Sequence, residues 1–486
     1  MKRRTIESPP LSTERSDTPT HPFTALTTFR PAQFRSWWED VQDSLWLIPA
    51  LGTLFCGALA FGLVWLDHRL ALTGGVEGLS WVFTGGSEGA RGVLSAIAAS
   101  IITVTATIFS IAVVAMQLAS GQFTPRVLRQ FTGDRANQIV LAVFIGTFTY
   151  SMLVLRTVRS EADAGGTFVP LLAVAVAIIL SLVCIGLLIF FIHHAARSIQ
   201  VSVIIDTAAD DTADLVRHHF REQPGTGFDL NAPRLPDGES FELCCRWGSY
   251  VQDLDEGNLL ALARDHDLTI HVLEPVGAFA YDGAVLARVW PAAHVDAEVD
   301  RQLHNTFVTG IERTLHHDVA FGVRQLADIA IKALSPGIND PTTATHAVDR
   351  LGGILTLAGR RLPPARILTV DGRPAVFLPT ITFEELLDLS YTQIRHFGAG
   401  DVVFISHLLV TLRRISDLVP PERHGALRRH TLLARDEART ALTMPEDIEA
   451  VDRLTAWLER DDPPLPRMDA ELFTSTTPEA PIQGVR

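Results

Sequence analysis

The sequence predicts a membrane protein with four transmembrane α-helices, followed by a cytoplasmic α+β domain that contains a small β-module and a helical region. Two observations lead to this prediction. The mean hydropathy is +0.21 although 20% of the residues are charged, so the apolar residues must be concentrated in one part of the chain. They lie in the first 200 positions, in four windows without formal charge. Each window holds about 20 apolar residues, which is the length that a helix needs to cross the hydrocarbon core.

The four windows give the predicted spans. We expect transmembrane helices near residues 45–66, 93–119, 138–155 and 168–192, within a transmembrane domain of residues 37–197. Trp37, Trp38, Trp46 and Trp65 flank the first span. Tryptophans gather at both surfaces of a bilayer, so membrane lipid is the first expected partner.

The arginines of the short connections predict the orientation. Six lie on the side of the chain termini, namely Arg30, Arg35, Arg126, Arg129, Arg135 and Arg197. Four lie on the opposite side, namely Arg69, Arg91, Arg156 and Arg159. Basic residues favour the cytoplasmic side, so we expect both termini in the cytoplasm. A reducing compartment also suits Cys244 and Cys245, whose spacing suggests neither a disulfide framework nor a zinc site.

The remaining segments differ in composition and periodicity. Residues 1–36 and 462–486 are rich in proline and charge, and we expect both tails to be disordered. We expect residues 198–238 to form a helical extension of the fourth span and a linker. Residues 293–461 are predicted to be a mostly helical domain that contains a hairpin with Asp371-Gly372 at its tip. Residues 239–292 alternate like short strands and weakly resemble a biotinyl-type barrel-sandwich. No lysine stands where a carrier lysine would, so this β-module is interpreted as structural.

Several classes of function are disfavoured. The formal net charge of −14 argues against nucleic acid as a partner, because phosphates would repel the chain. No nucleophile elbow, metalloprotease motif, P-loop or dinucleotide fingerprint is present, so we expect no enzyme activity and no cofactor. His316, His317, Asp318 and His346 form a loose group that is more typical of a surface than of a metal site.

The second span carries a polar stripe. Thr103, Thr107, Ser110, Val114 and Gln117 follow steps of four and three, which places them on one helix face. Such a stripe is typical of close packing between transmembrane helices. It also suits a water-lined path in which several subunits place hydroxyl and amide groups around one axis. No acidic, basic or histidine side chain lies inside a predicted span, which argues against a proton-coupled pump.

The segment ALSPGINDPTTA, residues 333–344, predicts a hard corner between two helices. Its members of interest are Ser335, Pro336, Gly337, Asn339, Asp340, Pro341 and Thr342. Pro336 stops the first helix and Gly337 can take a positive φ, while Asp340 suits the N-cap and Pro341 the first position of the next helix. Exposed N–H groups at a helix start can also hold an anion, so structural and anion-binding interpretations both remain open.

Two long motifs resemble a known family. They are SPGINDPTTA with the preceding FGVRQLADIAIKAL, and the second span with its following loop, RGVLSAIAASIITVTATIFSIAVVAMQLASGQFTPRVLRQFTGDRANQ. Both resemble the bacterial predicted membrane proteins called domain of unknown function 2254, over roughly residues 40–460. The resemblance implies a multi-span protein of the bacterial inner (cytoplasmic) membrane with a cytoplasmic C-terminal domain. It implies no particular activity.

The leading interpretation is a homo-oligomer that passes an ion or small solute along the stripe of the second span, with a cytoplasmic domain that assembles or gates it. The alternative is a non-conducting membrane scaffold or sensor whose cytoplasmic domain binds a partner. The two differ in whether the stripe faces water or another helix.

Overall fold

The computed structural model describes residues 46–72, 86–122, 134–160, 167–198, 200–222, 235–314, 318–363 and 367–459. The tails predicted for residues 1–36 and 462–486 lie outside these ranges, as do His316 and His317.

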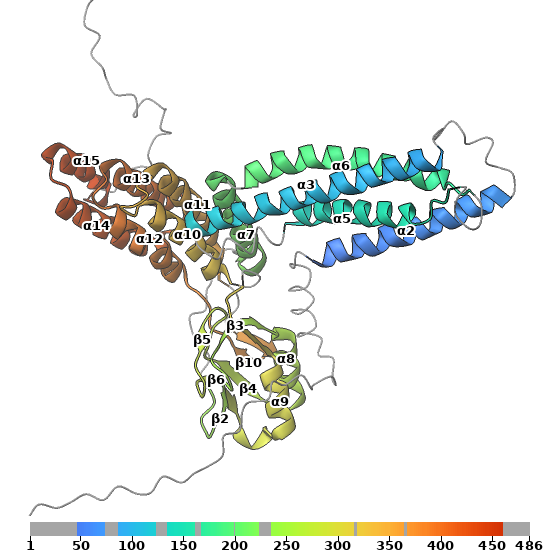
Figure 1. The fold of residues 1–486 in the computed structure, drawn as a ribbon. Helices are drawn as coiled ribbons and strands as arrows, with labels where there is room; N and C mark the ends of the chain where they lie inside the picture. Colours follow the sequence, from blue (N-terminus) through green and yellow to red (C-terminus); the bar gives the residue numbers. More distant parts are fainter. Residues whose placement is uncertain are drawn as a thin grey trace, which may run out of the picture.

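Four long apolar helices form the N-terminal part of the protein and lie side by side, each running antiparallel to the one before it in the chain (Figure 1). They are α2 (Leu47–Leu72), α3 (Ser87–Gln122), α5 (Arg135–Leu155) and α6 (Leu171–Ser198). Each is long and apolar enough to cross a membrane, so the prediction of four transmembrane helices is confirmed. We call the end of this bundle where α6 leads into the C-terminal part the domain end, and the opposite end the loop end.

Two exposed tryptophans at the first membrane helix are spaced as the two surfaces of a bilayer would be. Trp46 directly precedes α2, and Trp65 lies toward its other end. Both residues are largely exposed, at 62% and 61%. The 19 positions between them correspond to about 28 Å of helix, close to the roughly 30 Å of a hydrocarbon core. The bundle therefore carries an aromatic residue at each expected membrane surface.

Helix α5 is the centre of the bundle, because half of its most apolar stretch is buried, compared with 17% in each of α2, α3 and α6. Small residues allow the closest of its contacts. A Cβ atom added at Gly52 of α2 would lie 2.9 Å from Cβ of Ala142, and one added at Gly146 of α5 would lie 2.7 Å from Sγ of Cys56. Backbones approach this closely in membranes where glycine and alanine line the contact.

Helix α7 (Val201–His219) is a separate helix and not the continuation of the fourth span that we expected. Gln200 takes an extended conformation between α6 and α7. Helix α7 then packs on α10 (Val319–Ala333) and α11 (Pro341–Gly359) within the core of the C-terminal part. The Asp206 carboxylate of α7 pairs with His346 and Arg350 of α11 at 2.9 and 2.8 Å.

The β-module is larger than predicted. Its five-stranded sheet has the order β2 (Phe241–Cys244), β6 (Val285–Trp290), β4 (Thr269–Val272), β10 (Arg373–Phe377), β9 (Ile367–Val370). The hairpin expected at Asp371-Gly372 is present as β9–β10, and β10 joins the five-stranded sheet by pairing with β4 in parallel. A second sheet has the order β5 (Phe279–Ala280), β3 (Ser249–Leu254), β7 (Phe307–Gly310).

Helices α8 (Glu256–Asp265) and α9 (Ala297–Asn305) pack on the strands of this module, and both sheets share one core with them. The resemblance of residues 239–292 to a barrel-sandwich is therefore wrong. The local alternation was read correctly as strands, but long-range pairing and helix cover decide the architecture.

The helical region completes the C-terminal part. It contains α10, α11, α12 (Phe383–Gly398), α13 (Val402–Leu418), α14 (His424–Ala441) and α15 (Pro445–Thr455). Three short 3-10 helices also occur in the C-terminal part: η3 (Ala292–His294) after β6, η4 (Pro421–Arg423) before α14, and η5 (Ala456–Glu459) after α15. A two-stranded ribbon of β1 (Arg221–Glu222) and β8 (Arg361–Leu362) joins the ends of α7 and α11. The α+β character predicted for the C-terminal domain is confirmed.

Candidate functional site

Helix α3 has one face that packs inside the bundle. Its buried residues recur at helical spacing, and they are Ala90, Leu94, Ala98, Ile101, Thr105 and Ile108. This face contacts α5 and α6. Among the α3 side chains that the structure describes, Ile108 is the last buried one on the way to the domain end.

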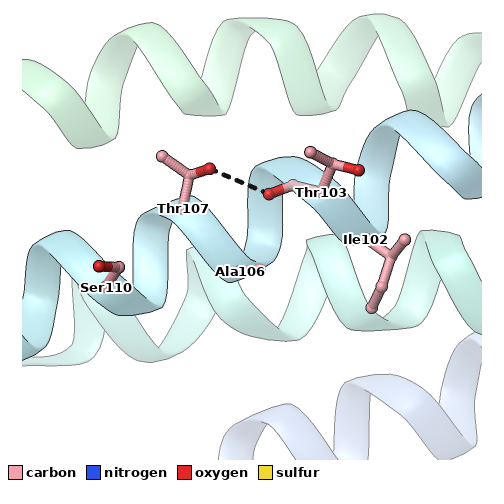
Figure 2. Close-up of a pocket in the computed structure, with 5 residues that line it drawn as sticks. All are labelled: Ile102, Thr103, Ala106, Thr107 and Ser110. Carbon is pink, nitrogen blue, oxygen red and sulfur yellow. Dashed lines mark hydrogen bonds between the residues drawn. The ribbon is translucent and has the colours of Figure 1, made fainter.

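The predicted polar stripe lies on the opposite, exposed face of α3. Thr103, Thr107, Ser110, Val114 and Gln117 are all exposed. Figure 2 shows Thr103, Thr107 and Ser110 on the side of α3 that faces away from α5, and together with Ile102 and Ala106 they line a shallow hollow. No helix that the structure describes in the same chain buries this stripe.

The exposed face of α3 differs in chemistry from the exposed faces of its neighbours. Helices α2 and α6 expose large apolar side chains, which suit contact with lipid, including Leu54, Phe61, Ile185 and Ile189. Around the stripe α3 instead exposes small residues, including Ser95, Ala99, Ser100 and Ala106. Ile102, Phe109 and Ile111 flank this surface and are also exposed. The middle of α3 therefore presents a small and polar strip between apolar borders.

Two hydroxyl groups of the stripe donate within α3 itself. Thr103 Oγ1 donates to the carbonyl oxygen of Ala99 at 2.8 Å, and Thr107 Oγ1 donates to the carbonyl oxygen of Thr103 at 3.1 Å (Figure 2). This back-bonding uses the hydroxyl protons and leaves oxygen lone pairs available. The stripe therefore offers acceptors more readily than donors.

The stripe continues past the packed bundle. Val114 and Gln117 lie six and nine positions beyond Ile108, which corresponds to about 9 and 13 Å of helix. Since Ile108 is the last buried side chain described on α3, these two residues lie where α3 emerges from the bundle. Thr103, Thr107 and Ser110 are consequently the members of the stripe at the level of the packed helices.

A second set of polar residues, which the sequence reading missed, is buried inside the bundle on α5. It comprises Asn137, Gln138, Thr147 and Ser151. Thr147 donates to the carbonyl oxygen of Val143 and accepts from Cys184 Sγ at 3.4 Å, which links α5 to α6. The sequence did contain a signal for this set, because the shortest predicted span, residues 138–155, carries several polar residues. A helix at the centre of a bundle can hold such residues away from lipid.

Charged residues hold both ends of the bundle. At the loop end, α2 extends beyond the predicted span, and its Asp67 carboxylate accepts the N–H groups of Leu172 and Ala173 at the start of α6. Arg91 of α3 donates to the carbonyl oxygen of Val158 at 2.9 Å. At the domain end, Asp134 accepts from His194 of α6 and from the N–H of Ala136. These contacts fix the helix ends and leave the apolar interior uncharged.

The corner between α10 and α11 uses its polar groups internally. The Asp340 carboxylate is the N-cap of α11, accepting the N–H of Thr343 at 3.1 Å and its hydroxyl at 2.6 Å, and Pro341 begins the helix. Asp340 in turn donates its N–H to the carbonyl oxygen of Ala333 at 2.8 Å. The hydrogen bonds from Thr343 hold the pKa of Asp340 below its usual range. Its negative charge occupies the position that a bound anion would take.

Gly337, which could have taken a positive φ, does not take one. Asn339 is the corner residue with the left-handed conformation, at φ 50°, while an added Cβ at Gly337 would meet nothing within 4 Å. Asparagine tolerates this conformation better than most residues, so it makes the turn instead. Ser335 ends α10 by donating its hydroxyl to the carbonyl oxygen of Lys332, whereas Pro336 and Thr342 are exposed.

The loose histidine group is dispersed in the part of the chain that the structure describes. His346 pairs with Asp206, and Asp318 accepts two hydrogen bonds from Arg313. Within the described ranges, no group of three or more His, Cys, Asp or Glu side chains is placed to hold a metal ion. The four cysteines carry free thiols.

Four membrane-spanning helices and an appended α+β domain define a multi-pass membrane protein. The chain belongs to the family described as Predicted membrane protein (DUF2254), whose model matches residues 42–414. An uncharacterized protein of Mycobacterium bovis is 32% identical over 433 residues, which cover 87% of this chain and 82% of the relative. An uncharacterized protein of Mycobacterium tuberculosis matches with the same identity and coverage. No solved structure matches the chain.

Proposed function

We propose that several copies of this protein assemble around α3 and that the stripe of Thr103, Thr107 and Ser110 lines a path for small ions. The observation that carries the proposal is the position of the stripe, on a helix face that the described helices of the same chain leave exposed. A small, hydroxyl-rich face is a poor surface for lipid and a good one for close approach between helices.

Assembly around α3 explains the contrast between the exposed faces of the bundle. Bringing α3 from several copies together removes its polar strip from lipid and leaves the apolar faces of α2 and α6 outside. The flanking Ile102, Phe109 and Ile111 then supply apolar contacts between copies. Rings of hydroxyl and amide groups around an axis can replace part of an ion's hydration shell.

The path favours small cations. Thr103 and Thr107 have their hydroxyl protons engaged within α3, so their oxygen lone pairs face outward. Copies of α3 that run parallel also bring their C-terminal ends, which carry partial negative charge, to the same mouth. The exposed Ser110 adds another hydroxyl, and selectivity among cations is weak because no charged side chain belongs to the stripe.

The C-terminal domain assembles or gates the path. Helix α7 follows α6 after an extended Gln200 and belongs to the core of the domain, so a displacement of that core acts on the end of α6. The arginine bias supports a bacterial inner-membrane location with both termini in the cytoplasm. Reporter fusions after Arg35 and Arg197 should both give cytoplasmic signals, and a periplasmic signal from either contradicts this orientation.

Current through planar bilayers tests the proposal. Protein reconstituted at increasing density should carry cation-selective current, and Thr107→Phe should block it because a bulky ring fills the hollow beside Thr103. Leu54→Phe is the matched control, since Leu54 is exposed on α2, away from the stripe. The absence of current from all three proteins contradicts conduction. The stripe is then a dry contact between copies, and the role of a non-conducting scaffold or sensor takes its place.

A further inference from the structure

The sheet β5–β3–β7 lies outside the membrane bundle (Figure 1), and large apolar side chains are exposed on and beside its strands. We call this region the aromatic surface, and it comprises Trp247, Tyr250, Phe279, Tyr281 and Ile311. Tyr250 of β3 pairs with Phe279 of β5 on one side and with Gly310 of β7 on the other, and Ile311 directly follows Gly310 in the chain. Trp247, Tyr281 and Ile311 are 81%, 72% and 92% exposed.

The rings of the aromatic surface are held by one another. Tyr250 and Phe279 meet edge to face with centroids 5.0 Å apart, and Phe279 meets Tyr281 in the same way at 5.2 Å. The backbone at Gly248 lies against the Phe279 ring, where an added Cβ would come within 3.4 Å. Rings fixed in this way lose little conformational entropy when a partner binds. Exposed clusters of tryptophan and tyrosine are typical of protein-binding surfaces.

The chemistry of the surface suits a proline-rich partner. Pro-x-x-Pro segments bind to aromatic surfaces in an extended conformation that costs little ordering entropy. The chain itself carries four such segments, at residues 19–22, 233–236, 463–466 and 478–481. Of these, only Pro463-Pro464-Leu465-Pro466-Arg467 has an arginine directly after its last proline. Asp282 is exposed directly beside Tyr281 and offers a carboxylate to the arginine of this segment. An ion pair between Arg467 and Asp282 would therefore add to the contact of the prolines with the rings.

The described chain ends at Glu459, and only three residues separate it from Pro463. Four residue steps span at most about 14 Å. Helix α15 and the following η5 lie at the end of the helical region remote from the β-module (Figure 1). We propose that the aromatic surface of one copy binds residues 463–467 of a second copy. Such a contact joins two different patches, so it either closes a ring of copies or continues as a chain.

A peptide-binding measurement tests this contact. The receptor is the full chain with Pro463, Pro464 and Pro466 replaced by alanine, so that its own residues 463–467 do not compete with the peptide. A fluorescent peptide of residues 459–470 should bind it saturably, as followed by anisotropy. Trp247→Ala or Tyr281→Ala in the receptor should weaken binding about tenfold or more, since both rings lie in the contact. Val403→Ala, which removes an exposed apolar side chain of α13, should have no effect.

Two further binding measurements test whether the aromatic surface recognises residues 463–467 specifically. Asp282→Asn should weaken binding of the native peptide but not of a peptide carrying Arg467→Ala, because the two changes remove the same ion pair. The peptide of residues 5–15, which contains Pro9-Pro10, should bind more weakly because it lacks the Pro-x-x-Pro spacing. Equal or tighter binding of that peptide overturns the proposal. So does a binding constant that Trp247→Ala and Tyr281→Ala leave unchanged, or no binding. None of these results depends on whether the protein conducts ions.

Discussion

The carboxylate of Asp67, in the last turns of α2, accepts the backbone N–H of Ala173 in α6 at 3.0 Å. Its other oxygen accepts the N–H of Leu172 at 3.1 Å. The side chain thus acts as the cap of a helix that begins more than 100 positions later, and Asp67 is only 7% exposed. The contact ties the first transmembrane helix to the fourth at the loop end of the bundle.

This contact predicts a stability effect. Asp67→Ala leaves two buried N–H groups without acceptors and should cost about 1–3 kcal/mol of unfolding free energy. Asp67→Asn keeps one acceptor oxygen and should cost less. Thermal melting of the detergent-purified protein measures both. Glu88→Ala is the control, because Glu88 is exposed in the first turn of α3. A melting temperature for Asp67→Ala no lower than that of the control refutes the cross-helix cap.

The corner predicts an unequal effect of two neighbouring substitutions. Asp340→Ala removes the N-cap of α11 and should cost about 0.5–2 kcal/mol. Gly337→Val should change stability by no more than about 0.5 kcal/mol, because the position is exposed, has no positive φ and has space for a side chain. Melting of the two variants side by side is the measurement. A lower melting temperature for Gly337→Val than for Asp340→Ala would mean that the turn requires glycine at this position.

Stability should fall on acidification partly through His430. Burial lowers the pKa of this histidine, while Asp388, which bonds to its Nε2 at 2.6 Å, opposes the shift, and Arg429 and Arg395 add to it. A folded-state pKa below the unfolded value, about 6.5, means that the folded protein binds fewer protons. The neutral, buried His430 therefore contributes its full stability to the folded state above about pH 6.5. This stability is lost as the pH falls toward the folded-state pKa of the histidine.

Melting temperatures measured between pH 7.5 and 5.5 test this prediction. The decline should be shallower in His430→Gln than in the native protein, because the substituted side chain does not titrate. His218→Gln changes an exposed histidine of α7 and should keep the native slope. Identical slopes in all three proteins mean that His430 is not held neutral by its burial.

The membrane helices could be predicted because hydropathy is a local property. A window of about 20 apolar residues without charge has few alternatives to a spanning helix. The central position of α5 could not be predicted in the same way, since it follows from the packing of Gly52 on Ala142 and of Gly146 on Cys56. The periodicity of Thr103, Thr107 and Ser110 placed them on one face, but only the neighbouring helices decide whether that face is covered.

Long-range pairing accounts for the remaining differences. The hairpin of β9 and β10 was readable from Asp371-Gly372 at its tip, yet its place beside β4 joins segments about 100 positions apart. The aromatic surface was missed for the same reason, because Tyr250 and Phe279 come together only after β3 pairs with β5. At the corner, Asn339 took the conformation that Gly337 could have taken, a choice that local propensity leaves open.

Cysteine accessibility tests the central claim most directly. In a background with Cys56, Cys184, Cys244 and Cys245 replaced, single cysteines are placed at Thr103, Thr107 and Ser110, and the protein in bilayers is treated with a membrane-impermeant thiol reagent. Leu54 and Leu182, which are exposed on α2 and α6, provide controls for lipid contact, and Ile108 provides the control for burial within the bundle. A water-filled path predicts fast reaction at the three stripe positions and slow reaction at the three controls. Stripe cysteines that are as unreactive as the controls would contradict the path.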